Sequence, residues 1–464
     1  MPTYSPLLTD QYQLVMAYNY WKLGLAEQEA IFHLSFRMLP LQSLFMVAAG
    51  LERIIEFLRD FKFTASDLTY LEGVENGDGA LFSGEFLTYL SNLTFTCDLD
   101  GVPEGTIVYA KEPVLRIKGP ILQCQLLETP LLNFINFATL IATKASQVYL
   151  AAQDDPVIEF GLRRAQGPDG GLTASRSAYI GGCSATSNVL AGKLYDIPIN
   201  GTQAHSWIMA FPSELEAFQK FATIMKSNTV LLVDTYDTLN GIKHAIETAK
   251  LLAAEKETLA AIRLDSGDLL ELSRKARNLL DNAGLSETKI IASGDLDEHV
   301  IRTLKENNAP IDSWGVGTRL VTSHDQPSLN AIYKLTALKN ISGEWDYKIK
   351  LSNDPQKSTI PGILQTRRLF EHGLPVEDII YDIELGEELF KTKKPHESQD
   401  LLQTIFQKGV LTYTLPNIHQ IRSQTLEQVK IHSSFALKPY PVSLGQNLQL
   451  TIEKLLEKIK KMNA

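Results

Sequence analysis

The sequence predicts an α/β protein in which a β-rich module precedes a domain of alternating strands and helices. The first supporting observation is a series of short apolar runs after Pro156, each followed by a helical pattern. Strands that alternate with helices favour βα units and a parallel sheet, either open or closed as a barrel. The runs are 156–161, 197–202, 229–237, 259–267, 288–295 and 312–318. The helical stretches lie near 170–194, 212–226, 238–255, 268–283 and 297–307.

The second observation concerns the ends of these runs. Nearly every run finishes in Gly, Asp, Thr or Arg. In a βα barrel the active site lies at the carboxyl ends of the strands. The sequence therefore predicts a catalytic or binding site on that rim.

The third observation is a period of two between residues 93 and 118, with turn residues in its middle. This alternation predicts several short strands early in the chain. A half-buried strand is also predicted over 32–36, where apolar and polar residues alternate. Helical spacing predicts helices over 9–24, 50–59 and 120–152, the last bent at Pro130.

These patterns divide the chain into three segments. Residues 1–153 form an N-terminal helix and a β-rich sandwich domain with a long linking helix, and residues 154–335 form the α/β barrel. Residues 336–464 complete the sandwich and the exterior of the barrel, with strands over 333–339 and 346–351 and a helical tail from Leu448.

Composition excludes several classes of protein. The chain has 464 residues and a formal net charge of −10, without the basic stripe that a nucleic-acid binder shows. Its three cysteines are widely spaced and form no CxxC pair, which favours reduced thiols over a zinc site. No signal peptide and no run of 18 apolar residues is visible, so we expect a cytoplasmic protein without a membrane partner.

Candidate ligand-binding residues follow the first strands of the barrel. Phe160 and Arg163 are three residues apart, a spacing that lets an aromatic face and a guanidinium address one flat anion. His205 follows another strand, close after Thr202, and is a candidate base or phosphate carrier. Taken singly, each of these residues has an ordinary structural explanation, because a lone Phe or His is more often a core or hydrogen-bonded residue.

Acidic residues end the later strands. Asp234 is a candidate metal ligand or a carboxylate that orients His205. Asp265 could hold ribose hydroxyls or magnesium, and Arg263 beside it could hold a carboxylate. The same segment also contains good N-cap residues, and both roles are compatible.

Glycines mark the last two strand ends. Gly294 lets a ligand approach the backbone just before Asp295. Gly315, Gly317 and Thr318 form a short loop after an apolar strand, and backbone N–H groups of such loops cradle phosphates. The position in the late strands of a barrel favours a phosphate site.

Seven segments in this order resemble the nicotinate phosphoribosyltransferase family. They are LLTDQYQLVMAYNYWKLG (7–24), FGLRRAQGPDGG (160–171), GGCSATSNVLAGKLY (181–195), GTQAHSW (201–207), LLVDTYDTLNG (231–241), IRLDSGDL (262–269) and WGVGTRL (314–320). The resemblance implies an irregular α/β barrel of the type II phosphoribosyltransferase kind, with an α+β sandwich built from the N-terminal and C-terminal segments.

The resemblance also implies roles for individual residues. His205 corresponds to a histidine that ATP phosphorylates, with Asp265 and Asp234 as the other catalytic candidates. The residues implied to bind nicotinate are Tyr12 from a partner subunit, Phe160, Arg163, Ser184, Thr202 and Arg263. Those implied to bind 5-phosphoribosyl 1-diphosphate are Gly294, Asp295, Gly315, Gly317 and Thr318.

The expected reaction joins nicotinate to 5-phosphoribosyl 1-diphosphate, with Mg²⁺ as cofactor, ATP as co-substrate and a homodimer that shares its active sites. A serine at position 184 avoids a negative charge that would repel a carboxylate, which favours the acid over the amide. Three alternatives stay open: a nicotinamide or quinolinate transferase, a lyase or isomerase on a phosphate-binding barrel, and a non-catalytic protein that binds phosphoribosyl diphosphate.

Overall fold

The computed structural model describes residues 4–77, 79–351, 358–386, 397–437 and 439–462. The chain divides into two compact units, which are described separately. Unit 1 comprises residues 1–140, 328–417 and 427–464, and unit 2 comprises residues 141–327 and 418–426. The domain boundaries predicted at 153/154 and 335/336 stay predictions.

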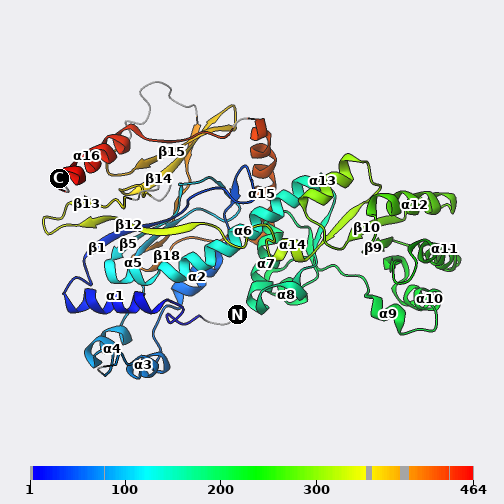
Figure 1. Cartoon of the computed structure of the whole chain (residues 1–464), viewed down its shortest axis with the longest axis horizontal. Coiled ribbons are helices and arrows are strands. Elements are labelled where there is room, and N and C mark those ends of the chain that lie inside the picture. The colour runs from blue at the N-terminus through cyan, green and yellow to red at the C-terminus, as the bar shows by residue number, and fades with distance from the viewer. Residues whose placement is uncertain (1–3, 78, 352–357, 387–396, 438, 463–464) are drawn as a thin grey trace. The chain divides into compact units, whose positions relative to one another are not determined.

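Unit 1 is an α+β structure built on sheets that are antiparallel except for the parallel pair of β15 and β19 (Figure 1). Its largest sheet has seven strands in the order β13 (Trp345–Tyr347), β12 (Ala331–Lys339), β1 (Glu29–Phe36), β5 (Pro113–Pro120), β3 (Asp98–Gly101), β17 (Gln403–Gln407) and β18 (Val410–Leu411). A second sheet has the order β16 (Glu397–Asp400), β14 (Leu364–Glu371), β15 (Leu374–Asp382) and β19 (Val442–Leu444). A two-stranded sheet joins β2 (Met46–Val47) and β4 (Ile107–Val108).

The N-terminal and C-terminal segments thus share one sheet, because β1 pairs with β12 from Ala30 to Phe36. The helices of this unit are α1 (Gln11–Lys22), α2 (Leu51–Arg59), α3 (Ala65–Glu72), α4 (Gly84–Ser91), α5 (Ile121–Leu126) and α16 (Gln446–Met462). Two further helices belong partly to each unit by residue number: α6 (Glu128–Ala152) and α15 (Ile418–Ser433).

The half-buried pattern predicted for 32–36 is wrong, since both faces of β1 are largely covered. His33 is 4% exposed, and its Nδ1 lies 2.8 Å from Thr336 Oγ1 while Nε2 accepts from the Leu364 N–H. Burial lowers the pKa of His33 well below its usual value. A polar residue can occupy a core position when its hydrogen bonds are satisfied, which alternation alone does not reveal.

Unit 2 contains a six-stranded parallel sheet flanked by helices (Figure 1). The strand order is β7 (Ala185–Thr186), β6 (Val157–Glu159), β11 (Ser313–Val316), β10 (Lys289–Ser293), β9 (Ala261–Leu264) and β8 (Val230–Leu232). The helices are α7 (Gly167–Gly181), α8 (Val189–Tyr195), α9 (His205–Met209), α10 (Glu214–Met225), α11 (Thr238–Ala254), α12 (Leu269–Asn282), α13 (Glu298–Glu306) and α14 (Thr318–Val321).

The predicted strand at 197–202 is reduced to a single bridge. Ile199 pairs in parallel with Thr186 of β7, and the Gln203 side chain donates to the Val230 carbonyl at the start of β8. The segment therefore links the two outer strands of the sheet, which accounts for an irregular rather than a regular barrel. Pro198 and Gly201 interrupt the run and shorten the ladder.

The single helix predicted near 170–194 is wrong. The structure divides that stretch into α7, the short strand β7 and α8. Gly182 has φ +132° and ends α7, while a Cβ on Gly181 would lie 2.2 Å from the Ala142 carbonyl oxygen. Gly181 thus permits the close contact between α7 and α6, and Gly182 permits the backbone turn that ends α7, after which the chain enters β7.

Candidate active site

A cavity of unit 2 opens at the carboxyl ends of its parallel strands and has a volume of about 580 Å³. Each of the six strands either contributes a residue to the lining of this cavity or is directly followed by one. The lining residues are Phe160, Leu162, Arg163, Arg164, Ser187, Gly201, Thr202, Gln203, Ala204, His205, Leu232, Arg263, Asp265, Ser293, Gly294, Asp295, Gly315, Gly317 and Thr318.

Most of the residues predicted from the sequence therefore lie together. Asp234, Ser184 and Tyr12 are the predicted site residues that are absent from this lining. Unit 1 has a separate cavity of about 320 Å³, and none of the predicted site residues lines it. The chemistry expected from the sequence is thus concentrated on the strand-end rim of unit 2.

Arg263 is held in place by four hydrogen bonds. Its Nε donates to Ser293, its Nη1 donates to Thr202 Oγ1 and to the Gln203 carbonyl, and its Nη2 donates to Asp265 Oδ1. Four of the five N–H donors of a guanidinium are therefore already used within the protein. Arg263 joins the ends of neighbouring strands and brings positive charge to the floor of the cavity.

Asp265 is the acidic partner of that guanidinium. Burial would raise its pKa, but hydrogen bonds from Arg263 and Ser293 outweigh burial and hold the pKa below its usual value. Asp265 is consequently ionised at neutral pH. Its second oxygen, Oδ2, lies 3.9 Å from Nε2 of His205.

His205 begins α9 at the edge of the cavity, with about 42% of its side chain exposed. Its Nδ1 lies 3.1 Å from the Thr235 hydroxyl, which leaves Nε2 as the ring nitrogen toward Asp265. Thr235, rather than Asp234, thus contacts the imidazole and orients it. The spacing of an Asp-Thr pair after a strand does not reveal which of the two faces a histidine.

Asp234 instead braces the loop after β9. Its Oδ2 accepts from the Asp265 N–H at 3.1 Å and from the Ser266 hydroxyl at 2.5 Å. Its Oδ1 is buried and has no hydrogen-bond partner among the described residues. A buried carboxylate oxygen without a partner is costly unless a cation or water satisfies it.

The Phe160 ring, which follows β6, packs directly on Gly315 of the neighbouring strand β11. A Cβ on Gly315 would lie 2.6 Å from the Phe160 ring, so only glycine leaves room for the ring there. The Arg263 guanidinium lies 5.6 Å from the ring centroid, within the range of a cation–π contact. The ring and the guanidinium therefore line one side of the cavity together.

Arg163 and Arg164 belong to a short 3-10 helix, Leu162–Arg164, and both side chains are exposed on the cavity rim. Neither guanidinium makes a hydrogen bond or ion pair with the described part of the chain. They are the arginines of the lining whose donors are available to an anion. Arg164 was not singled out from the sequence, although it adjoins Arg163.

The glycines of the last strand ends permit close backbone packing. Gly294 has φ +86°, and a Cβ there would lie 2.0 Å from the Asp265 carbonyl oxygen. Asp295 follows in a left-handed conformation, with φ +46°, and lines the cavity. A Cβ on Gly317 would lie 3.2 Å from the Phe160 carbonyl oxygen, so this loop too is packed against the strand end.

Ser184 lies at the wrong end of the sheet for the role predicted from the resemblance. It precedes β7, and its hydroxyl donates to the carbonyl of Val157, the first residue of β6. Ser187 follows β7 and lines the cavity. Residues before β7 lie at the amino edge of the sheet, and residues after it lie at the carboxyl edge. Because β7 is only two residues long, the sequence pattern did not reveal this strand or the edge at which Ser184 lies.

Tyr12 lies on α1 in unit 1, where 51% of the residue is exposed. It is not part of the lining residues of the unit 2 cavity. Its predicted role in a neighbouring subunit stays a prediction.

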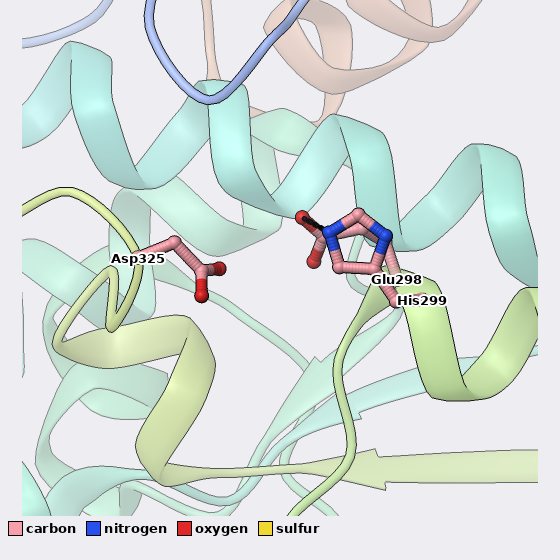
Figure 2. A group of neighbouring side chains, drawn as sticks. All are labelled: Glu298, His299 and Asp325. Atoms are coloured by element: carbon pink, nitrogen blue, oxygen red, sulfur yellow. Dashed lines mark ion pairs between the residues drawn. The ribbon is translucent and has the colours of Figure 1, made fainter.

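A group of possible metal ligands lies outside this cavity. Glu298, His299 and Asp325 bring ligand atoms within 4.8 Å of one another (Figure 2). However, the fully buried Lys144 ammonium donates to Glu298 Oε1 at 2.7 Å and to Asp325 Oδ2 at 2.6 Å. A lysine cation therefore already binds both carboxylates, and we assign this group a structural role.

No helix in the described ranges has the combined length and hydropathy that a membrane crossing needs.

Comparison with protein families covers most of the chain. Residues 7–136 match the nicotinate phosphoribosyltransferase N-terminal domain, and residues 156–409 match the nicotinate phosphoribosyltransferase family. A nicotinate phosphoribosyltransferase from Bacillus subtilis is 42% identical over 95% of this chain and 93% of that protein. One from Dictyostelium discoideum is 36% identical over 97% of this chain and 88% of that protein.

Solved structures agree with the sequence comparisons. The human nicotinic acid phosphoribosyltransferase superimposes with a TM-score of 0.84 at 29% identity, covering 96% of this chain and 99% of that chain. The nicotinate-nucleotide pyrophosphorylase of Pyrococcus furiosus shares the fold, with a TM-score of 0.72 at 24% identity over 92% of this chain and 96% of that chain. The predicted type II phosphoribosyltransferase fold is confirmed, and the chain belongs to the nicotinate phosphoribosyltransferase family.

Proposed function

We propose that this chain transfers the phosphoribosyl group of 5-phosphoribosyl 1-diphosphate to the ring nitrogen of nicotinate, giving nicotinate mononucleotide and diphosphate. The observation that carries the proposal is one cavity lined by an aromatic ring, arginines, an imidazole and two glycine loops. The ring nitrogen forms a bond to the anomeric carbon while the bond to diphosphate breaks. The protein contributes positioning and electrostatic stabilisation.

The flat pyridine ring of nicotinate fits against Phe160, the aromatic side chain of the lining. Its carboxylate needs a cation with free donors, and Arg163 and Arg164 supply them at the rim. Arg263 uses four of its donors internally, so we assign it to orienting Thr202, Ser293 and Asp265 and to a positive field beside the ring. This refines the direct contact that the sequence resemblance implied.

Preference for the acid over the amide follows from these charges. A carboxylate gains from arginines with available donors, whereas a neutral amide gains much less. We transfer the role first given to Ser184 to Ser187, whose neutral side chain lines the cavity and brings no repelling carboxylate.

The phosphoribosyl group is assigned to the loops after β10 and β11. Gly315 lies in β11, and Gly317 and Thr318 follow that strand, so the backbone N–H groups of this glycine loop can bind a phosphate. Asp295, which follows Gly294, is placed to accept from ribose hydroxyls. Both loops come from neighbouring parallel strands, so one sugar phosphate can reach both.

Magnesium fits the acidic residues of this rim. The buried Asp234 Oδ1 lacks a hydrogen-bond partner among the described residues. Asp234 follows β8, and the cavity residues Asp265 and Asp295 follow the next two strands of the sheet, β9 and β10. Hard carboxylate oxygens are the ligands that Mg²⁺ prefers. When bound there, the ion would neutralise charge on the departing diphosphate.

ATP enters the proposal through His205. An imidazole nitrogen forms a bond to the γ-phosphorus of ATP as ADP leaves, and water later cleaves that bond to release phosphate. The contact between Nδ1 and Thr235 fixes the ring, and the ionised Asp265 beside Nε2 stabilises positive charge on the imidazole. Hydrolysis of the phosphohistidine then drives the overall reaction toward the mononucleotide.

The active assembly is proposed to be a homodimer that shares its sites, with the exposed Tyr12 facing the nicotinate of the neighbouring subunit.

A cytoplasmic location is proposed from the cysteines. Cys97, Cys124 and Cys183 are all free, and the sulfurs of Cys97 and Cys124 stay 3.9 Å apart. Unbonded neighbouring thiols are typical of a reducing compartment.

The proposed function is tested by measuring mononucleotide formation from nicotinate, nicotinamide and quinolinate with 5-phosphoribosyl 1-diphosphate. We expect nicotinate to give by far the highest kcat/KM. A preference for either other pyridine would contradict the assignment, and binding of phosphoribosyl diphosphate without any product would indicate a non-catalytic protein.

A further inference from the structure

A buried carboxylate lies directly beneath the aromatic and arginine side of the cavity. Glu159, the last residue of β6, is 1% exposed and does not line the cavity. It forms no ion pair with a cation in the described ranges of the chain. Burying an ionised carboxylate without a cation requires several hydrogen bonds to its oxygens.

Three hydrogen bonds supply that stabilisation, each from a different segment. Oε1 accepts from the Gly161 N–H, while Oε2 accepts from the Ser175 hydroxyl at 2.9 Å and from the Thr186 hydroxyl at 2.6 Å. Gly161 belongs to the loop that carries Phe160 and Arg163, and Ser175 lies in the middle of α7. Thr186 ends β7, immediately before the cavity residue Ser187.

The direction of these hydrogen bonds is fixed by Asn188. Its side-chain amide donates to Ser175 Oγ at 3.2 Å, and its backbone N–H donates to Thr186 Oγ1 at 3.0 Å. Because both hydroxyls already accept from Asn188, the Thr186 hydrogen is available to Glu159, whereas the single Ser175 hydrogen is shared between Glu159 Oε2 and the Gly171 carbonyl oxygen, each 2.9 Å away. The Gly161 N–H and the Thr186 hydroxyl therefore donate to one Glu159 oxygen each, and the site favours an acceptor at both oxygens.

Gly161 is confined on its other side as well. A Cβ on this residue would lie 2.2 Å from a methyl group of Val321 in α14, so the loop packs between that side chain and the Glu159 carboxylate. The Phe160 N–H donates to the Val316 carbonyl at 2.8 Å, which fixes the preceding residue. The backbone that presents the ring and both arginines is thus held from three directions.

We propose that Glu159 is a positioning residue that fixes the 160–164 loop and Ser187 in the geometry that binds the pyridine carboxylate. The inference rests on the proposed function of the cavity. Glu159 touches no substrate in this account and acts through Gly161, Ser175 and Thr186. Its loss should therefore weaken nicotinate binding far more than binding of phosphoribosyl diphosphate, which is assigned to the loops after β10 and β11.

The test compares two substitutions at this position. Glu159→Ala removes both acceptors, and we expect the KM for nicotinate to rise about tenfold or more, since small displacements of binding groups have effects of this size. Glu159→Gln keeps an acceptor for Gly161 when its amide oxygen takes the place of Oε1 but turns an NH2 group toward the Ser175 and Thr186 hydroxyls, so its KM should rise by less than that of Glu159→Ala. The KM for phosphoribosyl diphosphate should change little in either variant.

Asp312→Ala is the matched control. Asp312 lies before β11 at the amino edge of the same sheet, and its carboxylate accepts from the Ile290 N–H at 2.7 Å. The Asp312→Ala substitution therefore removes a carboxylate–backbone hydrogen bond far from the strand ends that line the cavity. The KM for nicotinate in this variant should stay at the parent value. Equal KM values in Glu159→Ala and the parent would overturn the inference, as would a fall in kcat alone in both Glu159 variants.

Hydrogen exchange provides a readout that does not depend on catalysis. In the protein without substrates, Glu159→Ala should increase exchange at the Gly161 amide and its neighbours, whereas Glu159→Gln and Asp312→Ala should leave it protected. If the parent makes no mononucleotide, the proposed function fails while this exchange measurement still decides the positioning role. Should Glu159→Ala not fold, Thr186→Val removes one donor at constant shape and should raise the KM for nicotinate about threefold; an unchanged KM there would contradict the inference.

Discussion

His205 is the residue on which coupling to ATP depends in this account. Its ring is fixed through Nδ1 by Thr235, and its other nitrogen faces the ionised Asp265. Neither contact involves the Phe160 ring or the Gly315–Gly317 loop. The chemistry of ATP can therefore be separated from the transfer reaction by a change at one residue.

We predict that His205→Ala retains some transferase activity and loses its stimulation by ATP. Alanine has no nitrogen to accept a phosphoryl group, while the ring slot and the phosphate loop are unchanged. The measurement is the rate of mononucleotide formation with and without ATP, in the variant and the parent. Equal stimulation in both would refute the phosphohistidine role.

Glu112 is the residue of unit 1 whose ionisation should affect stability. It is 0% exposed, as is Asp378, and both lie close to the buried Arg368. Burial raises the pKa of Glu112 well above its usual value, and the negative charge of Asp378 raises it further. The guanidinium of Arg368 already forms hydrogen bonds with both Asp378 oxygens, whereas burial disfavours the charged form of Glu112.

The sign of the pH effect follows from this raised pKa. The folded state keeps a proton on Glu112 that the unfolded chain loses above about pH 4.5, so stability falls as pH rises from there through the folded pKa. Glu112→Gln is neutral at every pH and should gain stability relative to the parent as pH rises. Urea unfolding at pH 5, 7 and 9 measures the difference, and a difference that is independent of pH would contradict this account.

The candidate site could be predicted from the sequence where residues directly follow an apolar run. Phe160, Arg263 and Gly317 were found in this way, because parallel strands bring their carboxyl ends to one edge. Thr235, Ser187 and Glu159 were missed because the direction of a side chain at a strand end depends on pairing that the run does not encode. Ser184 was misplaced for the same reason, since it stands on the opposite side of a two-residue strand.

Among the elements, the strand β11 shapes the aromatic slot. Gly315 lies in β11, directly against the Phe160 ring that follows β6, and the two strands are neighbours. A side chain at position 315 would occupy the space of the ring. The slot therefore depends on a residue that need not touch the substrate.

Gly315→Ala should displace the Phe160 ring and raise the KM for nicotinate about tenfold, because a buried overlap of this size forces side chains to move. The KM for phosphoribosyl diphosphate should rise less. Steady-state kinetics with each substrate varied in turn provides the measurement. Gly84→Ala is a control for general effects of glycine substitution, since its φ is not positive and its Cβ would meet no atom within 4 Å; an unchanged KM for nicotinate in Gly315→Ala would show that the ring does not form the slot.

Elements with a strong period were predictable, and those set by tertiary contacts were not. The helices α1, α2, α10, α11, α12 and α13 lie within a few residues of the predicted stretches. The bend predicted at Pro130 is displaced, because the helical stretch breaks between α5 and α6 and Pro130 falls in the first turn of α6. Proline is tolerated in a first turn, where the N–H that it lacks has no partner within the helix.

At the scale of the whole molecule, the fold joins distant parts of the chain into unit 1. The pairing of β1 with β12 links residues that are about 300 positions apart, and β3 pairs with β17 at a similar separation. Such pairings depend on the complete core rather than on local pattern, which is why the sandwich could be expected only from the family resemblance. The barrel rhythm of unit 2, by contrast, is local and was visible directly.

A shared active site can be tested by mixing two inactive variants. If Tyr12 serves the neighbouring subunit, Tyr12→Ala and Arg263→Ala should each have low activity, and refolding them together should restore about a quarter of parental activity through dimers with one intact site. Product formation by the mixture, measured beside each variant refolded alone, is the readout. No gain in the mixture would contradict a site built from two subunits.

The assignment of the cavity is tested most directly by one assay on the purified chain: mononucleotide formation from nicotinate and 5-phosphoribosyl 1-diphosphate, with and without ATP. We expect nicotinate mononucleotide in both conditions, with a clear increase when ATP is present. Absence of product from nicotinate in both conditions, from a folded protein, would contradict it.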